Sequence, residues 1–232
     1  MSSPLVYDVQ QADKEIAAPK ERVRILDGVE LQVRPQETVS IVGSSGSGKT
    51  TLLHLLGGLD VPSQGRILFQ GQDLNRLSWS EKSRLRNEKI GFIFQFHHLL
   101  AEFTTLENVA MPAFISGRSR NESLHLARDA MEVIGISPLA DQKVGTLSGG
   151  ERQLAALARA VILGPEVILA DEPTGNLDAA NGAKVGELLV ELNQSLGTTL
   201  IVVTHNTDLA SKMRSRFKIQ AGKLYALEPI AY

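Results

Sequence analysis

The sequence predicts an α/β fold built on a parallel sheet, and three observations support this prediction. Short apolar runs typical of buried strands lie at residues 38–42, 167–170 and 199–203. A glycine-rich loop follows the first run directly and leads into a helical pattern. Between the last two runs, apolar residues recur at helical spacing from Val185 to Leu196. Strands that alternate with helices in this way form parallel sheets.

Length and composition narrow the class of protein. The chain has 232 residues and 43% hydrophobic content, which is enough for one domain with a full core. The 24 Lys and Arg residues are balanced by 26 Asp and Glu residues, so the chain has a formal net charge of −2. Because such a chain has no strong positive field to attract phosphates, we expect no nucleic acid among its partners. The absence of cysteine excludes disulfides and thiolate metal sites.

The sequence also indicates how the chain relates to membranes. No apolar run approaches the roughly 20 residues that span a bilayer. Residues 1–4 lack the features of a signal peptide. We therefore expect any part in membrane transport to depend on a partner chain.

The first third of the chain is predicted to be rich in strands. Residues 10–24 are the least structured stretch by pattern, after which Val29, Leu31 and Val33 alternate with polar residues as in a strand. A helix is predicted at residues 51–56, and a short strand at 65–71.

Residues 80–162 follow a mostly helical pattern, with one amphipathic helix at 122–134. We interpret the whole chain, 1–232, as a single domain. Within it, residues 1–94 and 161–232 form a nucleotide-binding core, and residues 95–160 form an inserted helical subdomain.

The glycine-rich loop satisfies every fixed position of the phosphate-loop pattern and has the expected strand before it and helix after it. Consecutive backbone N–H groups and a helix N-terminus then face a nucleotide's phosphates. A glycine-rich turn that binds nothing fits the complete match poorly. The predicted nucleotide-binding residues are Gly43, Ser44, Ser45, Gly46, Ser47, Gly48, Lys49, Thr50 and Thr51. Lys49 is expected at the β- and γ-phosphates, and the Thr50 hydroxyl at Mg²⁺.

Two adjacent carboxylates, Asp171 and Glu172, end the second predicted strand, on the edge of the sheet where ligands bind. Asp171 is expected to hold Mg²⁺ and Glu172 to orient or deprotonate an attacking water. The alternative is that both only cap the turn begun by Pro173. His205 follows the third strand and could reach a γ-phosphate, although most single histidines are structural.

A second glycine element begins at Leu147 and ends at Glu151. Ser148 and Glu151 form a capping box for a helix from Gly149 to about Leu163. Glycines are poor residues for a first helical turn, which suggests that a ligand approaches the backbone there. On this motif alone, a binding role and a plain cap are equally favoured.

Six motifs in a fixed order resemble the ATP-binding cassette (ABC) transporter ATPases, from about Val23 to Tyr225. They are the phosphate loop 43–50, Gln95 after residues 90–94, the signature 147–153, the strand 167–172, the D-loop 175–178 and His205. Segments 46–60, 94–100 and 106–112 are most similar to the ATPase subunits of lipoprotein-releasing systems (LolD type). Macrolide-export and cell-division ATPases share that branch.

The resemblance implies a P-loop NTPase (RecA-like) fold, with a parallel sheet core, an N-terminal antiparallel β-subdomain and the inserted helical subdomain. It implies ATP and Mg²⁺ as cofactors. The roles it implies are catalysis by Glu172, His205 and Gln95, Mg²⁺ binding by Thr50, Gln95 and Asp171, and a D-loop contact by Asp178. It also implies that the signature acts in trans on a second copy, through Ser148, Gly149, Gly150 and Glu151.

The resemblance implies two kinds of partner, a second copy of the chain and integral membrane permease subunits. It also implies that this chain is a peripheral protein at the cytoplasmic face of the inner membrane. Residues 96–103 are the candidate contact with the permease, unless their apolar side chains only pack the helical subdomain. The expected function is ATP hydrolysis that powers release or export of lipoproteins or a related amphiphile. The alternatives are a mechanotransmitting ATPase of the cell-division type and a macrolide or peptide exporter.

Three departures from the family pattern bear on function. No Phe, Tyr or Trp lies between Tyr7 and Phe69, and the region near Ile16, where relatives stack an aromatic residue on adenine, is aliphatic or charged. We therefore expect weak selectivity for the base. Leu154 and Asn206 stand where the family usually has Arg and Asp, which leaves the turnover rate open.

Overall fold

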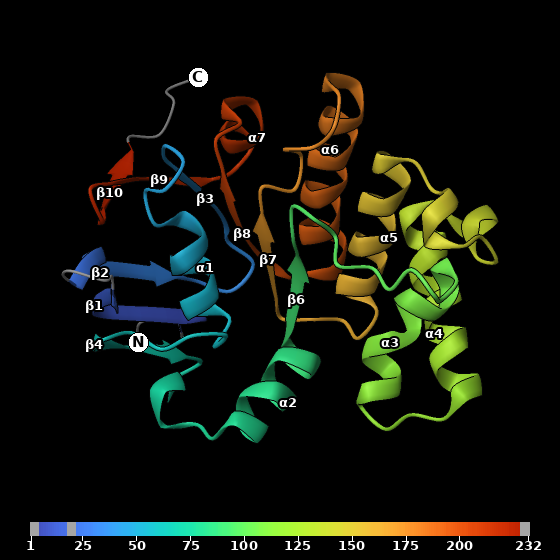
Figure 1. Cartoon of the computed structure of the whole chain (residues 1–232), viewed down its shortest axis with the longest axis horizontal. Helices are drawn as coiled ribbons and strands as arrows, with labels where there is room; N and C mark the ends of the chain where they lie inside the picture. Colours follow the sequence, from blue (N-terminus) through green and yellow to red (C-terminus); the bar gives the residue numbers. More distant parts are fainter. Residues whose placement is uncertain (1–4, 18–21, 228–232) are drawn as a thin grey trace.

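The computed structural model describes residues 5–17 and 22–227, which form two sheets and their covering helices (Figure 1). The smaller sheet is antiparallel, with strand order β2-β1-β4-β5. Its strands are β1 (Tyr7–Ala17), β2 (Arg22–Val33), β4 (Gln64–Phe69) and β5 (Gln72–Asp73). This sheet is the predicted N-terminal antiparallel unit.

The larger sheet has the order β10-β9-β3-β8-β7-β6. Its strands are β3 (Thr38–Val42), β6 (Ile90–Ile93), β7 (Val167–Asp171), β8 (Thr199–Thr204), β9 (Ser215–Gln220) and β10 (Lys223–Leu227). All neighbours pair in parallel except β10, which is antiparallel to β9. The parallel core and the three strands predicted for it are confirmed.

Seven helices cover the sheets within the described residues: α1 (Lys49–Leu56), α2 (Trp79–Lys89), α3 (Thr105–Ile115), α4 (Arg120–Ile134), α5 (Gly149–Val161), α6 (Ala179–Leu196) and α7 (Thr207–Ser211). Short 3₁₀ turns lie at Leu74–Arg76, Ser137–Leu139 and Val144–Thr146. In Figure 1, α3, α4 and α5 gather at the end of the molecule away from the antiparallel sheet. None of the described helices is sufficiently long and apolar to cross a bilayer.

Two buried clusters hold these layers together. One joins α1 to both sheets, with Leu52 and Leu53 of α1 fully buried against strand residues such as Ile41. The other joins α3, α4, α5 and α6 to the opposite face of the parallel sheet, through residues such as Leu157 and Ile168. The glycine-rich loop 43–48 thus joins two elements, β3 and α1, that are both anchored in the first cluster.

One prediction about local structure is wrong, and another, the mostly helical stretch 80–162, is confirmed with one added strand. Residues 10–17, expected to be the least structured, belong to β1, and residues 22–24 belong to β2. Irregular pairing between β1 and β2 from Val9 to Glu15 breaks the alternation of side chains that reveals a strand. The mostly helical stretch also contains β6, which is four residues long and includes Gly91. Strands this short carry too little periodicity to be recognised without their neighbours.

Candidate functional site

The phosphate loop connects the carboxyl end of β3 to α1, as its sequence predicts. Gly48 precedes the helix with φ 104°, a left-handed conformation that glycine adopts without strain. Lys49 is buried at the first helical position, and its Nζ donates to the carbonyl oxygens of Gly43 (2.8 Å) and Ser44 (3.1 Å). The ammonium therefore lies across the loop, where a phosphate chain would lie against it.

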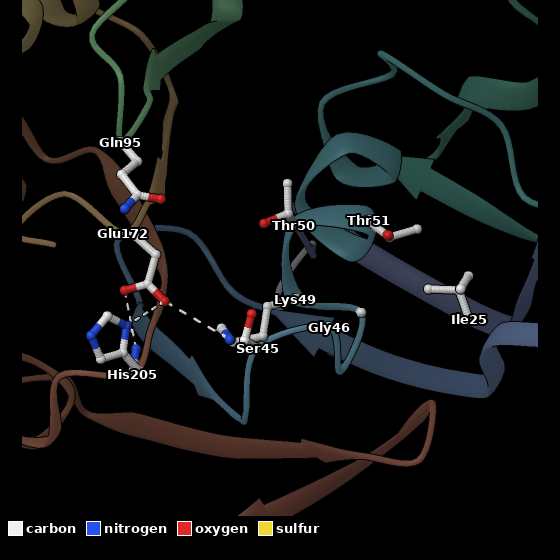
Figure 2. A pocket seen from close by; sticks show the side chains of 10 residues that line it. Ile25, Ser45, Gly46, Lys49, Thr50, Thr51, Gln95, Glu172 and His205 are labelled. Carbon is white, nitrogen blue, oxygen red and sulfur yellow. Dashed lines mark hydrogen bonds and ion pairs between the residues drawn. The ribbon is translucent and has the colours of Figure 1, made fainter.

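A pocket of about 690 Å³ opens above this loop (Figure 2). It is lined by Ile25, Ser45, Gly46, Gly48, Lys49, Thr50, Thr51, Gln95, Glu172 and His205. The fold thus brings together predicted residues from four separate segments of the chain. In Figure 2, Gln95, Glu172 and His205 occupy one end of the pocket, and Ile25 lies at the other end beyond Thr51.

Glu172 is held by polar groups on both of its carboxylate oxygens. Oε2 accepts hydrogen bonds from Thr204 Oγ1 (2.9 Å) and from the backbone N–H of His205 (3.1 Å). Oε1 lies 2.9 Å from His205 Nδ1 and 3.8 Å from Lys49 Nζ. The Glu172 backbone has φ 45°, which is strained for a residue with a side chain. Such strained, fixed carboxylates are typical of sites where a water or a proton is held.

Asp171 is buried at the end of β7, and its Oδ1 accepts a hydrogen bond of 3.1 Å from Thr50 Oγ1. Burial raises the pKa of the Asp171 carboxyl above its usual value, although the Thr50 hydrogen bond opposes this shift. A cation beside the pair would favour the ionised form. Asp171 therefore lies at the carboxyl end of its strand, beside the phosphate loop.

The signature lies elsewhere in the molecule. Ser148 and Glu151 form the predicted capping box of α5, which ends at Val161. Neither these two residues nor Gly149 and Gly150 line the pocket of the described chain. Figure 1 shows α5 on the right and α1 on the left, with strands of the parallel sheet between them. The second glycine element cannot reach its own chain's phosphate loop in this structure.

Gly149 has no reason within this fold to be glycine. A Cβ built there meets no described atom within 4 Å, and its backbone is not in the left-handed region. Open space therefore lies over the first turn of α5, where free N–H groups point outward. Asp178, the predicted D-loop residue, also lies outside the pocket and caps α6 by accepting from Asn181 N at 3.0 Å.

One lining residue was not predicted. Ile25 of β2 lies in the pocket, whereas Ile16, placed near the base by the resemblance, pairs with Val23 in the β1–β2 ladder and is 48% exposed. No sequence signal marks Ile25, because its apolar side chain reads as an ordinary strand residue. The end of the pocket beyond Thr51 is therefore lined by an aliphatic side chain.

The two departures near the motifs have structural explanations. Asn206 caps α7, since its Oδ1 accepts from Asp208 N (2.9 Å) and Leu209 N (3.1 Å). Leu154 packs against the buried cluster below α5. Each of these residues therefore has a structural role in this chain, Asn206 as a helix cap and Leu154 in packing.

Comparisons with known proteins agree with this geometry. The family described as "ABC transporter" matches residues 26–175. A lipoprotein-releasing system ATP-binding protein LolD of Nitratidesulfovibrio vulgaris is 54% identical over 224 residues, covering 97% of this chain and 96% of the relative. A LolD protein of Shewanella frigidimarina is 48% identical over 219 residues, covering 94% and 92%.

Solved structures show the same fold. The ATP-binding cassette MJ0796, in a dimeric post-hydrolysis state bound to ADP and phosphate, superposes with a TM-score of 0.90 at 33% identity, covering 97% of this chain and all of that chain. CbiO1 of Clostridium perfringens, part of the transporter complex CbiONQ, has a TM-score of 0.84 at 27% identity, covering 96% and 88%. By fold, motif order and sequence identity, the chain belongs to the ABC transporter family of ATP-binding proteins.

Proposed function

We propose that this ATP-hydrolysing chain powers the release of lipoproteins from a membrane, as one subunit of an ABC transporter. The LolD proteins, which match it at 47–54% identity over nearly its whole length, support this function over the cell-division and exporter alternatives. Its position would be peripheral, at the cytoplasmic face of the inner membrane. Residues 95–160 would act as the helical subdomain on a core formed by 1–94 and 161–232.

The observation that carries the mechanism is the outward-facing signature. A pocket that binds phosphates on one side only would leave ATP exposed, and the first turn of α5 has open space in front of it within the described chain. Its N–H groups could therefore receive an anion. Two copies stacked head to tail would place Ser148 and Gly149 of each on the nucleotide of the other. Because ADP lacks the γ-phosphate that these groups would contact, hydrolysis would remove the interaction that favours closure. The dimeric cassette MJ0796 supports this arrangement.

Each pocket residue then has a role consistent with its contacts. Lys49 would exchange its carbonyl partners on the loop for β- and γ-phosphate oxygens. Glu172 would accept a proton from the attacking water, and His205 would hold the Glu172 carboxylate and contact the γ-phosphate. Asp178 would act at the dimer interface, beside the α6 cap that it forms.

The side chains near Thr50 suit Mg²⁺. The Thr50 hydroxyl, the Asp171 carboxylate and the Gln95 amide all offer oxygen, which is the donor that Mg²⁺ prefers. Within the described residues, no group of three His, Cys, Asp or Glu side chains could hold a metal without other ligands. The proposed site would use one carboxylate, that of Asp171, together with neutral oxygens and the phosphates. When bound, Mg²⁺ supplies positive charge to the phosphates.

The surface that would contact the membrane subunits lies beside Gln95. Phe96 is 72% exposed and Leu100 is 43% exposed, so residues 96–103 do not only pack the helical subdomain. A cavity of about 200 Å³ is lined by Phe94, two residues before Phe96 in the chain, and by residues that include Arg86 and Pro112. Exposed apolar residues beside a hollow are typical of protein contact sites.

Purification of the chain from detergent-solubilised membranes tests the proposed function. We expect integral membrane subunits to co-purify, and the reconstituted complex to release lipoproteins when ATP is added. Phe96→Ser should weaken co-purification, while Tyr225→Ser, which changes an exposed aromatic residue on β10 at the opposite edge of the sheet, should not. Capture of a cell-wall hydrolase regulator, or macrolide transport without lipoprotein release, would contradict the proposal.

A further inference from the structure

Gln95 is tied to Asn176 by two hydrogen bonds between segments 81 residues apart in sequence. Asn176 Nδ2 donates to the main-chain carbonyl oxygen of Gln95 at 2.9 Å. In return, Gln95 Nε2 donates to Asn176 Oδ1 at 3.4 Å. A Cβ on Gly175 would lie 3.3 Å from Gln95 Nε2, so the turn before Asn176 also packs closely on the amide.

The chemistry of these two contacts fixes the direction of the Gln95 amide. A main-chain carbonyl oxygen can only accept, so the group that Asn176 presents to it must be Nδ2. The other end of the Asn176 amide is then Oδ1, which can only accept, and the Gln95 atom that meets it must be Nε2. Oε1 of Gln95 is consequently the end left for the pocket, and Figure 2 shows it on the side that faces Thr50.

We propose that Asn176 is a positioning residue that presents Gln95 Oε1, and not Nε2, to the nucleotide pocket. The inference deepens the proposed function and rests on Gln95 as a ligand of Mg²⁺. The flipped amide would point an NH₂ group at the cation, which repels it. Without Asn176, both orientations of the amide are open, and the correct one must be selected each time nucleotide binds.

A second anchor holds the neighbouring backbone without Asn176. Arg159 of α5 donates to the carbonyl oxygens of His97 (2.5 Å) and His98 (2.7 Å). These two residues have φ of 55° and 49°, so this anchor supports a strained turn. Because Asn176 is exposed and Arg159 keeps the turn in place, replacing Asn176 should release the amide and leave the fold intact.

The test measures binding of a fluorescent, non-hydrolysable ATP analogue to the purified chain, with Mg²⁺ and with EDTA. The quantity compared is the ratio of the two Kd values. For Asn176→Ala we expect the Mg²⁺ enhancement of binding to fall roughly threefold to tenfold, as for loss of one orienting hydrogen bond, with the Kd in EDTA unchanged. In a Gln95→Ala background, Asn176→Ala should cause no further loss.

Asn75→Ala is the matched control, because Asn75 Nδ2 also donates to a main-chain oxygen, that of Gly65 at 3.3 Å, away from the pocket. It should leave the ratio unchanged. The proposal is overturned if Asn176→Ala weakens binding equally with and without Mg²⁺, if it has no effect, or if its effect persists without the Gln95 side chain. A wild-type ratio near one would instead reject the proposed Mg²⁺ site itself, and this inference with it.

Discussion

Lys49 and Glu172 show how the site satisfies its charges before a nucleotide arrives. The Lys49 ammonium is buried, yet two carbonyl oxygens of the loop and one carboxylate oxygen surround it. A buried charge without such partners would destabilise the fold. Phosphate oxygens can replace these partners one for one, so binding needs an exchange of contacts with little rebuilding of the loop.

The burial of Asp171 disfavours the charged form of its carboxyl group. Burial raises the pKa of Asp171 in the folded state above its value in the unfolded state. The ionised carboxylate therefore lowers the free energy of unfolding at pH values above the folded pKa. This cost is absent below the unfolded pKa of about 3.9, where both states are protonated. Asp171→Asn should therefore stabilise the nucleotide-free chain at pH 7 by on the order of 1 kcal/mol. The gain should vanish as the pH falls below about 4. Urea unfolding at several pH values measures this difference.

Asp178→Asn is the comparison, because the pKa of Asp178 is lowered in the folded state where that of Asp171 is raised. The hydrogen bond from the backbone N–H of Asn181 is the largest of the contacts that lower the Asp178 pKa, so this carboxylate is stabilising when ionised. Its replacement should give no gain at pH 7. A loss of stability in Asp171→Asn, or a gain that is independent of pH, would show that burial does not govern the Asp171 charge.

At the scale of elements, β6 depends on a close approach to α5. A Cβ on Gly91 would lie 2.4 Å from the carbonyl oxygen of Ala160, a backbone atom that cannot move by itself. Gly91→Ala should force β6 and α5 apart and destabilise the chain by about 1–3 kcal/mol. Thermal unfolding should show a Tm lower by about 2–4 °C for each kcal/mol in a chain of this size.

Gly145→Ala is the control for this substitution. Gly145 does not have a left-handed φ, and a Cβ added to it would meet no described atom within 4 Å. Its replacement should therefore change stability by less than about 0.5 kcal/mol. Equal stability of the Gly91 and Gly145 variants would mean that the contact between β6 and α5 is looser than the structure indicates.

The elements also show what a sequence can predict. The strands β3, β7 and β8 are apolar runs whose burial is complete or nearly so, and their patterns identified them. The alternation of Val29, Leu31 and Val33 identified the second half of β2, but β1 was missed because its irregular register with β2 disrupts the alternation. In β6, four residues with a glycine form a strand only because β7 provides the pairing partner. Local patterns predict elements that are regular by themselves, and not those that depend on a neighbour.

The same distinction applies to the site. The phosphate loop, Asp171, Glu172 and His205 follow strands whose parallel order brings their ends together. All of these contribute to the pocket lining except Asp171, which supports Thr50 from below. Ile25 and Asn176 could not be predicted. Their roles arise from contacts between the two sheets and between distant loops, and neither carries a residue type that indicates a ligand.

At the scale of the whole molecule, the structure separates two halves of a nucleotide site. The phosphate loop and the carboxylates lie at the edge of the parallel sheet, while the signature opens outward at the start of α5. One chain therefore offers a pocket that is open on one side, and N–H donors at the start of α5 that lie outside this pocket. In the proposed head-to-tail dimer, a second copy would supply the other side of each pocket, and dimerisation would then depend on the γ-phosphate.

Sedimentation of the Glu172→Gln variant tests this central claim most directly. The variant should bind ATP, hydrolyse it very slowly and, with saturating Mg-ATP, sediment at twice the mass of the 25.1 kDa chain, but as a monomer with ADP. Adding Ser148→Arg should leave the affinity of the monomer for ADP unchanged, because Ser148 lies outside the pocket of its own chain, and should abolish the ATP-dependent dimer. A Glu172→Gln chain that stays at 25.1 kDa with saturating Mg-ATP would contradict the account.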